Sequence, residues 1–257
     1  MRILYCKTLW GATAEMGNMP GENGYSRLFA RIRREGFNAI ETPVWMIEDP
    51  FAFSLERKRA GLEYVAMVNT CTWSPGNNVG EVSSNPSQKL SDHVKSLSEQ
   101  LLMAKELEPL FVNAHSGCDL WSVATARQYF TEALKLESEH GMMICHETHR
   151  GRVLYNPWAT RDLCREFPEL KLTADLSHFV CVAERVFSDA DEDWKEVMVE
   201  IARATRHIHA RVGYAQGPQV PDPRAPEYQA ALLQHEKWWD QILEKQAAQG
   251  VPMMTLE

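Results

Sequence analysis

The sequence lacks the features of membrane-spanning and exported proteins. No run of about eighteen apolar residues occurs, and the opening MRILYCKTLW has too short an apolar stretch for a signal peptide. The six cysteines, at positions 6, 71, 118, 145, 164 and 181, form no C-x-x-C pair, and several lie in apolar runs. We therefore expect a cytoplasmic protein with reduced thiols and no disulfides.

Positively charged residues are also fewer than negatively charged ones. The chain has 27 lysine and arginine residues against 35 aspartate and glutamate residues, which gives a formal net charge of -8. Because phosphate backbones are held mainly by clustered basic side chains, this balance argues against a nucleic-acid partner. It favours a small-molecule ligand.

The overall composition is that of a globular protein. The 257 residues are 44% hydrophobic and 24% charged, which provides enough apolar surface for a sizeable core. No low-complexity linker, repeated motif or shift in composition marks a second domain. We therefore predict a single domain over residues 1–257.

Short apolar runs alternate with longer segments of helical period, which predicts an α/β fold with a parallel sheet built from βα units. The eight predicted strands are residues 3–9, 38–43, 63–70, 110–115, 142–147, 171–176, 207–212 and 252–257. Eight such units predict a (β/α)8 TIM barrel.

The helices between these strands are marked by caps and by period. Asn85–Pro86 and Asn156–Pro157 each place a capping residue before a proline, and the C-terminal cap positions hold Gly36, Gly141 and Gly250. Residues 226–249 carry, near one stripe, Leu232, Leu233, Trp238, Trp239, Ile242 and Leu243. We interpret the Pro/Gly-rich residues 213–226 as a long loop on the catalytic face.

The chain stops at Glu257, inside the eighth predicted strand, whereas a barrel of this type normally adds a helix after that strand. The barrel is therefore predicted to lack its last helix. This indicates either a truncated form or a barrel whose last strand is covered by something else, such as a partner subunit, and we expect self-association.

Polar side chains follow several of the predicted strands. The stretch GMMICHETHRG, residues 141–151, runs from a buried strand directly into His146, Glu147, Thr148, His149 and Arg150. Since burying an unpaired charge is costly, a compensating group must lie beside these side chains.

Period-two alternation places candidate ligands at the same height of the barrel mouth. Glu147 shares a face with Cys145 and His149, and the corresponding groups on the next three strands are Asp175 with Thr173, His209 with His207 and Arg211, and Glu257 with Thr255. The set Glu147, Asp175, His209 and Glu257 forms an oxygen-rich cage for one divalent cation. Mn²⁺, Mg²⁺ or Co²⁺ suits such a cage better than a structural zinc, although Zn²⁺ also stays open.

These strand ends resemble those of the xylose-isomerase-like TIM barrels, also called the sugar phosphate isomerase/epimerase superfamily. The resemblance covers essentially the whole chain and rests on VNAHSG, CHETH, TADLSH, HIHAR and MTLE. It is nearest to the keto-sugar 3-epimerase branch, in which a Glu, an Asp, a His and a Glu after strands five to eight bind one metal. The resemblance implies the ligands Glu147, Asp175, His209 and Glu257, and a His178 that faces substrate.

One departure from the family's sequence pattern distinguishes between two possible reaction types. Aldose isomerases carry a Lys two residues after the Glu of strand five and an Asp-rich second metal site. Here that place holds His149, and TADLSH offers a single Asp. A one-metal proton transfer is therefore favoured over a two-metal hydride shift.

We accordingly predict a metal-dependent isomerase or epimerase of a small sugar, with Mn²⁺ as the preferred cation. The metal would chelate a carbonyl and its neighbouring hydroxyl and stabilise an enediolate, while the carboxylates of Glu147 and Glu257 remove and return the proton. The predicted substrate contacts are His115, His149, His178, Arg211 and Trp10. Arg211 is either a clamp for substrate or a salt-bridge partner of an acidic ligand.

Several other residues at the strand ends are less strongly indicated as members of the site. Trp45, like Trp10, either walls a sugar ring or packs a loop, and Glu41 either contacts a substrate hydroxyl or is structural. His146 and His207 are interpreted as packing or hydrogen-bonding residues outside the site. Without a convincing glycine-rich phosphate loop, free sugars or sugar acids are favoured over sugar phosphates.

Three alternatives stay open. A dehydratase of the same superfamily, acting on an inosose-like ring, would use the same proton abstraction with His149 as the acid for the departing hydroxyl. A type IV apurinic endonuclease would need a zinc cluster and a basic surface, against which the acidic balance argues. A non-catalytic sugar-binding protein would have a degenerate site, whereas an intact cage retains a stoichiometric cation.

Overall fold

The structure is a computed structural model that describes residues 1–12, 23–71 and 88–257. Eight parallel strands pair in chain order, and the last pairs with the first to close the barrel. The strands are β1 (Arg2–Thr8), β2 (Ala39–Pro43), β3 (Glu63–Asn69), β4 (Phe111–His115), β5 (Ile144–Glu147), β6 (Lys171–Ala174), β7 (Thr205–Ile208) and β8 (Met253–Leu256). The predicted (β/α)8 TIM barrel is confirmed.

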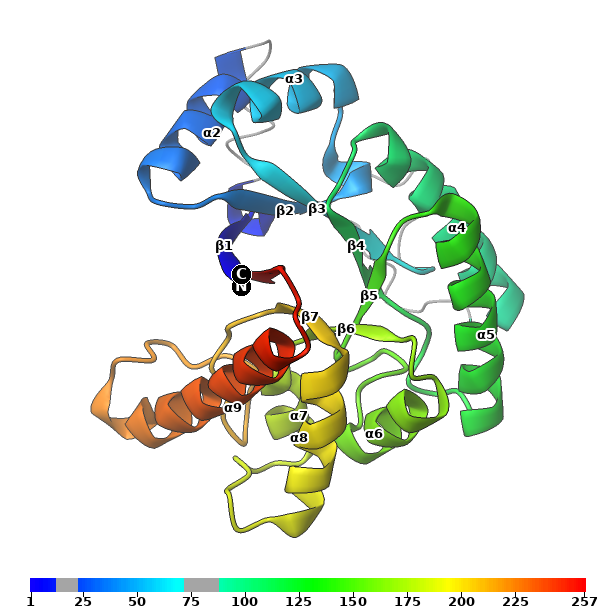
Figure 1. Ribbon diagram of the computed structural model, residues 1–257, viewed down its shortest axis with the longest axis vertical. Helices are drawn as coiled ribbons and strands as arrows, with labels where there is room; N and C mark the ends of the chain where they lie inside the picture. The colour runs from blue at the N-terminus through cyan, green and yellow to red at the C-terminus, as the bar shows by residue number, and fades with distance from the viewer. Residues whose placement is uncertain (13–22, 72–87) are drawn as a thin grey trace.

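Helices surround the barrel, as Figure 1 shows. The α-helices are α2 (Asn23–Arg34), α3 (Pro50–Ala60), α4 (Leu90–Glu106), α5 (Val123–His140), α6 (Pro157–Glu166), α7 (Leu176–Val182), α8 (Glu192–Ala204) and α9 (Gln229–Ala248), and the short 3-10 helices are η1 (Trp10–Ala12), η2 (Val44–Met46) and η3 (Pro226–Tyr228). None of the described helices is both long and apolar enough to cross a membrane.

Two of the predicted caps can be followed closely in the structure. Asn156 accepts a hydrogen bond from the Ala159 amide at 3.0 Å, with Pro157 as the first residue of α6. Gly141 ends α5 in the left-handed region at a φ of 63°, where a side chain would be strained. The cap predicted at Asn85–Pro86 lies outside the described residues.

Each predicted strand overlaps an observed one, but β6 and β7 end earlier than predicted. β6 ends at Ala174 because the Asp175 side chain accepts a hydrogen bond from the Ser177 amide and starts α7. β7 pairs with β6 only as far as Ile208 and therefore ends there. His209 and Arg211 consequently follow β7 instead of lying within it.

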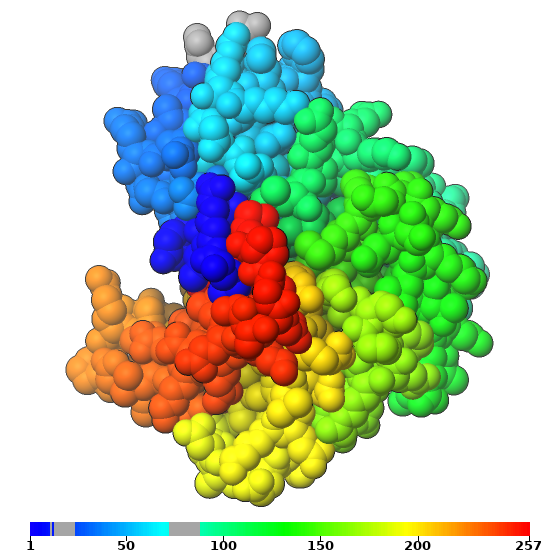
Figure 2. All heavy atoms as spheres, in the orientation of Figure 1, coloured from blue at the N-terminus to red at the C-terminus, as the bar shows by residue number. Residues whose placement is uncertain are grey.

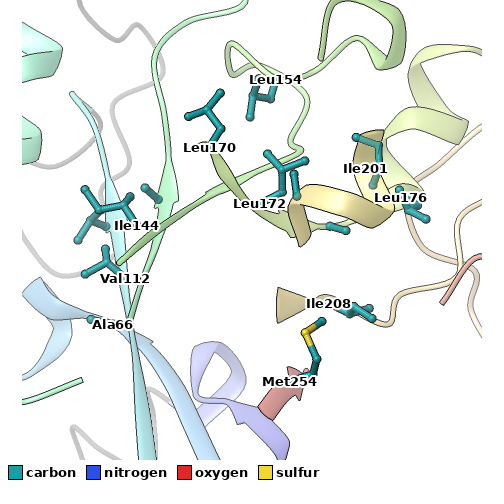
Figure 3. Packing of buried hydrophobic residues seen from close by; sticks show 14 of the residues in the cluster. Ala66, Val112, Ile144, Leu154, Leu170, Leu172, Leu176, Ile201, Ile208 and Met254 are labelled. Carbon is teal, nitrogen blue, oxygen red and sulfur yellow. The ribbon is translucent and has the colours of Figure 1, made fainter. Parts of the chain in front are cut away.

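The main hydrophobic core lies between the barrel and its helices. Figure 3 shows outward-facing side chains of successive strands in this core, including Ala66, Val112, Ile144, Leu172, Ile208 and Met254. A separate layer inside the barrel, below the polar side chains, contains Cys6, Ala39, Val65, Phe111 and Cys145. This packed layer fills the barrel interior among the described residues, so a site inside the barrel opens at the carboxyl ends of its strands.

The stripe predicted on the last helix is partly wrong. The buried residues of α9 are Ala231, His235, Trp238, Ile242 and Gln246, which recur at helical spacing, whereas Leu233 is 52% exposed. Leu233 lies two positions from the buried His235, which is more than half a turn around the helix. Leu233 therefore faces outward and contributes little to the core.

The outer surface of the barrel near the junction of β8 and β1 is unevenly covered. Met254 of β8 is fully buried, whereas Tyr5 of β1 is 54% exposed. Figure 2 shows the blue first strand and the red last strand side by side on the face in view. Association of this face with another subunit stays a prediction.

Candidate metal and substrate site

A cavity of about 600 Å³ opens at the carboxyl ends of the strands. It is lined by most of the predicted site residues: Trp10, His115, Glu147, His149, Asp175, His209, Arg211 and Glu257. Gln219, Val220 and Pro223 of the predicted long loop add to its wall. Of the predicted site residues, His178 alone is not part of the lining; it is buried behind it.

The loop approaches the barrel closely at Gly213. A Cβ added there would lie 2.8 to 2.9 Å from atoms of Ser177 in α7. Only glycine lets the backbone pass at this separation, so Gly213 permits the close approach of the chain that leads from Arg211 to the cavity wall.

His209 stands at the centre of the acidic side chains. Its Nδ1 lies 3.6 Å from Oε1 of Glu147 and 3.8 Å from Oε2 of Glu257, and its Nε2 lies 3.2 Å from Oε2 of Glu41. Burial alone would lower the pKa of His209, but the three carboxylates outweigh this and raise the pKa well above its usual value. The imidazole is thus surrounded by negative charge on both of its nitrogen sides.

Glu147, at the end of β5, is held mainly through one oxygen. Its Oε2 accepts hydrogen bonds from Nδ2 of Asn113 at 2.9 Å and from Nε2 of His115 at 2.7 Å. Burial would raise its pKa, but the charges and hydrogen bonds of His115 and His209 hold the pKa well below its usual value. Glu147 is therefore an ionised carboxylate whose Oε1 lies on the side of His209.

Asp175 has donors on both oxygens. Ser177 donates to Oδ1 through its amide and its hydroxyl, and a terminal nitrogen of Arg211 lies 2.6 Å from Oδ2. Burial nevertheless raises the pKa of Asp175, an effect that the Arg211 charge reduces. In this structure Arg211 therefore forms a salt bridge with Asp175 and also borders the cavity, and the choice between the two predicted roles stays a prediction.

Three histidines pack together at one side of the site: His115 and His149 line the cavity, and His178 lies behind them. The rings of His115 and His149 stack at 4.5 Å between centroids, and those of His149 and His178 lie 4.0 Å apart. Burial and the neighbouring His115 lower the pKa of His149 to about 3, and burial, His149 and Arg211 lower that of His178 to about 2. Both imidazoles are therefore neutral near pH 7 and act as hydrogen-bonding groups.

Trp10 lies at the open side of the cavity. Its ring is 38% exposed and meets the Trp45 ring edge-on at 6.1 Å between centroids. Trp45 is only partly buried and packs against the main core. Of the two tryptophans, Trp10 is the one that lines the cavity, while Trp45 supports it.

The sequence prediction underrated the side chains beneath the cavity. Glu41 is fully buried, so the predicted contact of its side chain with a substrate hydroxyl is wrong. Its hydrogen-bond partners are Asn113, His207 and His209. The available signal was a charged residue inside a predicted strand, which the structure places in the middle of β2. His207 bonds to Glu41 and Thr255, and His146 bonds to Ser116 outside the barrel, so both act as the hydrogen-bonding residues predicted.

The acidic and imidazole groups are spaced as ligands of an ion would be. Two atoms that each lie about 2.1–2.3 Å from one ion are roughly 3–4.5 Å apart, which is the spacing of His209 Nδ1 from the carboxylates of Glu147 and Glu257. Asp175 offers an oxygen within 4.8 Å of Glu147. The donors therefore fit a divalent cation.

Other combinations of these groups are also close enough to share an ion. Among the described residues they are Glu41 with His207 and His209, His115 with Glu147 and His149, and Glu147 with Asp175 and His178. Each triad contains at least one member of the predicted set of four ligands. The fourth, Glu257, lies near these groups because its Oε2 is 3.8 Å from Nδ1 of His209. The assignment of four ligands to one ion stays a prediction.

Known proteins that resemble this chain share its fold. No curated protein matches it. Among solved structures, a probable 3-DHS dehydratase of Bacillus anthracis is 14% identical, with a TM-score of 0.59 over 100% of this chain and 92% of that one. The 3-keto-D-glucoside 4-epimerase of E. coli is 11% identical, with a TM-score of 0.56 over 100% and 90%.

A third solved structure, a family 2 AP endonuclease of Brucella melitensis, is 18% identical, with a TM-score of 0.52 over 92% of this chain and 88% of that one. Such identities show the fold alone. The family model described as xylose isomerase-like TIM barrel matches residues 29–229, which is most of the sequence. The chain belongs to the xylose isomerase-like TIM barrel family.

Proposed function

We propose that the protein is a divalent-metal-dependent isomerase or epimerase of a small sugar or sugar derivative. The observation that supports this most directly is the approach of two carboxylates to one imidazole nitrogen at the cavity wall. Nδ1 of His209 lies 3.6 Å from Glu147 and 3.8 Å from Glu257, and all three residues line the cavity.

The proposed cation ligands are Glu147, Asp175, His209 and Glu257, with Mn²⁺ as the preferred ion. When bound, the cation would supply Lewis-acid stabilisation of negative charge on the substrate's carbonyl oxygen. Glu147 is ionised because His115 and His209 hold its pKa low, so its carboxylate is in the proton-accepting form, although the low pKa also makes it a weaker base.

In the proposed reaction, Glu147 removes a proton from the carbon beside the carbonyl, and Glu257 returns a proton to the opposite face of that carbon. Glu257 suits exchange with solvent because its side chain is 21% exposed, against 3% for Glu147. Inversion at that carbon makes an epimer; return of the proton to the neighbouring carbon makes an isomer.

The remaining wall residues would bind and orient the substrate. His149 uses Nδ1 to donate to the Arg150 carbonyl at 2.6 Å, so its Nε2 is an acceptor for a hydroxyl. Trp10 offers an apolar ring face at the cavity mouth, where a sugar would stack. Arg211 fixes Asp175 and borders the cavity.

The test is a screen of ketoses in deuterium oxide with the Mn²⁺-loaded protein, followed by NMR. We expect one substrate to gain deuterium at the reacting carbon and to form its epimer or isomer. Glu257→Gln should bind the metal more weakly and lose this exchange, whereas the matched control Glu244→Gln, on the exposed side of α9, should retain it. Exchange in Glu257→Gln at the wild-type rate would contradict the two-carboxylate scheme.

The same screen separates the alternatives. A dehydratase would release an enone-type product that absorbs in the ultraviolet, but His149, with a pKa of about 3, is neutral near pH 7 and has no acidic proton to give the departing hydroxyl. A sugar-binding protein would show ligand binding without deuterium exchange. The net charge of -8 continues to disfavour a DNA substrate.

A further inference from the structure

A second layer of polar side chains lies inside the barrel, directly beneath the candidate metal ligands. It consists of Glu41 on β2, Asn113 on β4 and His207 on β7, all completely buried and none of them part of the cavity lining. Buried polar groups of this kind are costly unless each is satisfied by a partner. Their partners therefore indicate their role.

The ring of His209 connects the two layers. Its Nε2 lies 3.2 Å from Oε2 of Glu41, in the lower layer, while its Nδ1 faces Glu147 and Glu257, in the upper layer. Because an ionised carboxylate only accepts hydrogen bonds, Nε2 must carry the proton in this contact. Nδ1 is then the nitrogen available to a cation.

We propose that Glu41 is a positioning residue: its carboxylate holds Nε2–H of His209 and so presents Nδ1 of that ring to the cation. The inference rests on the proposed function, because it assumes that His209 is a metal ligand. A carboxylate behind a ligating histidine fixes the tautomer and the ring orientation, and it strengthens the ligand.

The lower layer is better explained as a hydrogen-bond network than as a second ion site. His207 has partners at both ring nitrogens: Nδ1 lies 2.6 Å from Oγ1 of Thr255, and Nε2 lies 2.9 Å from Oε2 of Glu41. A cation bound by Glu41 and His207 would have to displace one of these contacts. Oε2 of Glu41 thus accepts from two imidazoles, and only one of them, His209, reaches the cavity.

Asn113 extends the same arrangement to the carboxylate ligand. Its Nδ2 donates to Oε1 of Glu41 at 2.8 Å and to Oε2 of Glu147 at 2.9 Å. One amide group therefore fixes both acids, and with His115 it occupies Oε2 of Glu147, which leaves Oε1 on the His209 side. The network thereby selects the ligand atoms Nδ1 of His209 and Oε1 of Glu147.

Substitution of Glu41 by glutamine has a predictable structural consequence. Both oxygens of Glu41 face donors, from Asn113 on one side and from His207 and His209 on the other. Whichever way the glutamine amide turns, its NH2 group meets a donor. The hydrogen bond to His209 is then lost, or Asn113 loses its acceptor.

The first test needs no substitution in the protein that is measured. Wild-type protein is loaded with Zn²⁺, and long-range ¹H–¹⁵N spectra of the imidazoles are recorded, with His209→Gln used only to assign the His209 signals. We expect a zinc-bound Nδ1 and a protonated Nε2. A zinc-bound Nε2 would overturn the inference alone, whereas failure of the wild-type protein to bind Zn²⁺ would overturn the proposed function as well.

The second test compares Mn²⁺ affinity by calorimetry in Glu41→Gln and in the matched variant His207→Gln. His207 bonds to the same carboxylate but does not reach the cavity, so its loss reproduces a purely structural disturbance. We expect the Kd for Mn²⁺ to rise about 10- to 100-fold in Glu41→Gln and to change little in His207→Gln.

Two further results complete this comparison. In the Co²⁺-loaded proteins, the visible absorption spectrum should change in Glu41→Gln and stay like the wild type in His207→Gln, because only the first alters the ligand geometry. Equal Mn²⁺ affinities in wild type and in a folded Glu41→Gln would overturn the inference. If Glu41→Gln does not fold, the spectrum of the Zn²⁺-loaded wild type decides.

Discussion

Nδ1 of His209 lies 3.6 Å from Oε1 of Glu147, although the two residues belong to different βα units. The barrel brings them together because the carboxyl ends of its strands converge on one mouth. The contact joins a buried acid to a buried base, and Glu257 approaches the same nitrogen at 3.8 Å. A cation at this point would balance the carboxylates that surround the histidine.

Metal binding should stabilise the fold. We expect Mn²⁺ at about 100 times its Kd to raise the free energy of unfolding by about 2.7 kcal/mol, since it binds the folded chain preferentially. Scanning calorimetry with and without Mn²⁺ measures the shift. The double variant Glu147→Gln and Glu257→Gln should lose most of it, and a wild-type melting temperature that saturating Mn²⁺ leaves unchanged would argue against the site.

Arg211 should stabilise the protein most when no metal is bound. Its guanidinium is 31% exposed and lies 2.6 Å from Oδ2 of the buried Asp175, so Arg211→Met leaves that carboxylate without its counter-charge. We expect a loss of about 1–3 kcal/mol in urea unfolding, reduced by Mn²⁺. The exposed pair of Arg224 with Asp222 provides the control Arg224→Met, for which we expect a much smaller loss of stability because exposed ion pairs contribute little. A loss that Mn²⁺ does not reduce would contradict this prediction.

Acid should destabilise the protein in part through His235. Nδ1 of this buried residue donates to the Ala231 carbonyl at 2.8 Å and Nε2 accepts from the Gly213 amide at 3.2 Å. Burial lowers its pKa from 6.5 to about 4, so as pH falls the unfolded chain binds the proton first. The contribution of His235 to the free energy of unfolding is therefore fully present above about pH 6.5. It is lost as the pH falls from about 6.5 to about 4.

The variant His235→Gln separates this effect from other acid-sensitive groups. It should be less stable than the wild type at pH 7.5 but should lose less of its remaining stability on acidification to pH 4. Urea unfolding over this range measures both quantities. Parallel pH profiles in the two proteins would show that His235 is not the group that binds the proton.

Trp10 should contribute to substrate binding more than to the chemical step. Trp10→Ala removes a 38% exposed ring from the cavity wall, so KM should rise by up to about tenfold with kcat nearly unchanged. Steady-state kinetics with the sugar found in the screen measure both constants. Phe51→Ala, at a 78% exposed position of α3, is the control, and equal KM values in the two variants would remove Trp10 from the site.

Much of the fold could be predicted from the sequence because each strand is a short apolar run between helical segments. The ends of the strands were harder to predict. His209 and Arg211 continue the alternation of β7, but β7 stops at Ile208 because its neighbour β6 gives way to the cap formed by Asp175. Strand ends depend on the neighbouring strand, and a single sequence does not specify that pairing.

The candidate site was predictable only in its upper layer. Glu147 and His209 follow apolar strands and stand out as polar residues, and the structure brings them together. Glu41 is a charged residue within β2, but its role depends on Asn113 and His209, which lie 72 and 168 residues further along the chain. Only closure of the barrel brings β2 within reach of these partners.

The central claim is that one divalent cation is held by Glu147, Asp175, His209 and Glu257. The most direct measurement is anomalous X-ray diffraction from crystals of the Mn²⁺-loaded protein. We expect a single strong peak about 2.0–2.4 Å from an oxygen of each carboxylate and from Nδ1 of His209. A peak among other side chains, or no peak at saturating Mn²⁺, would contradict it.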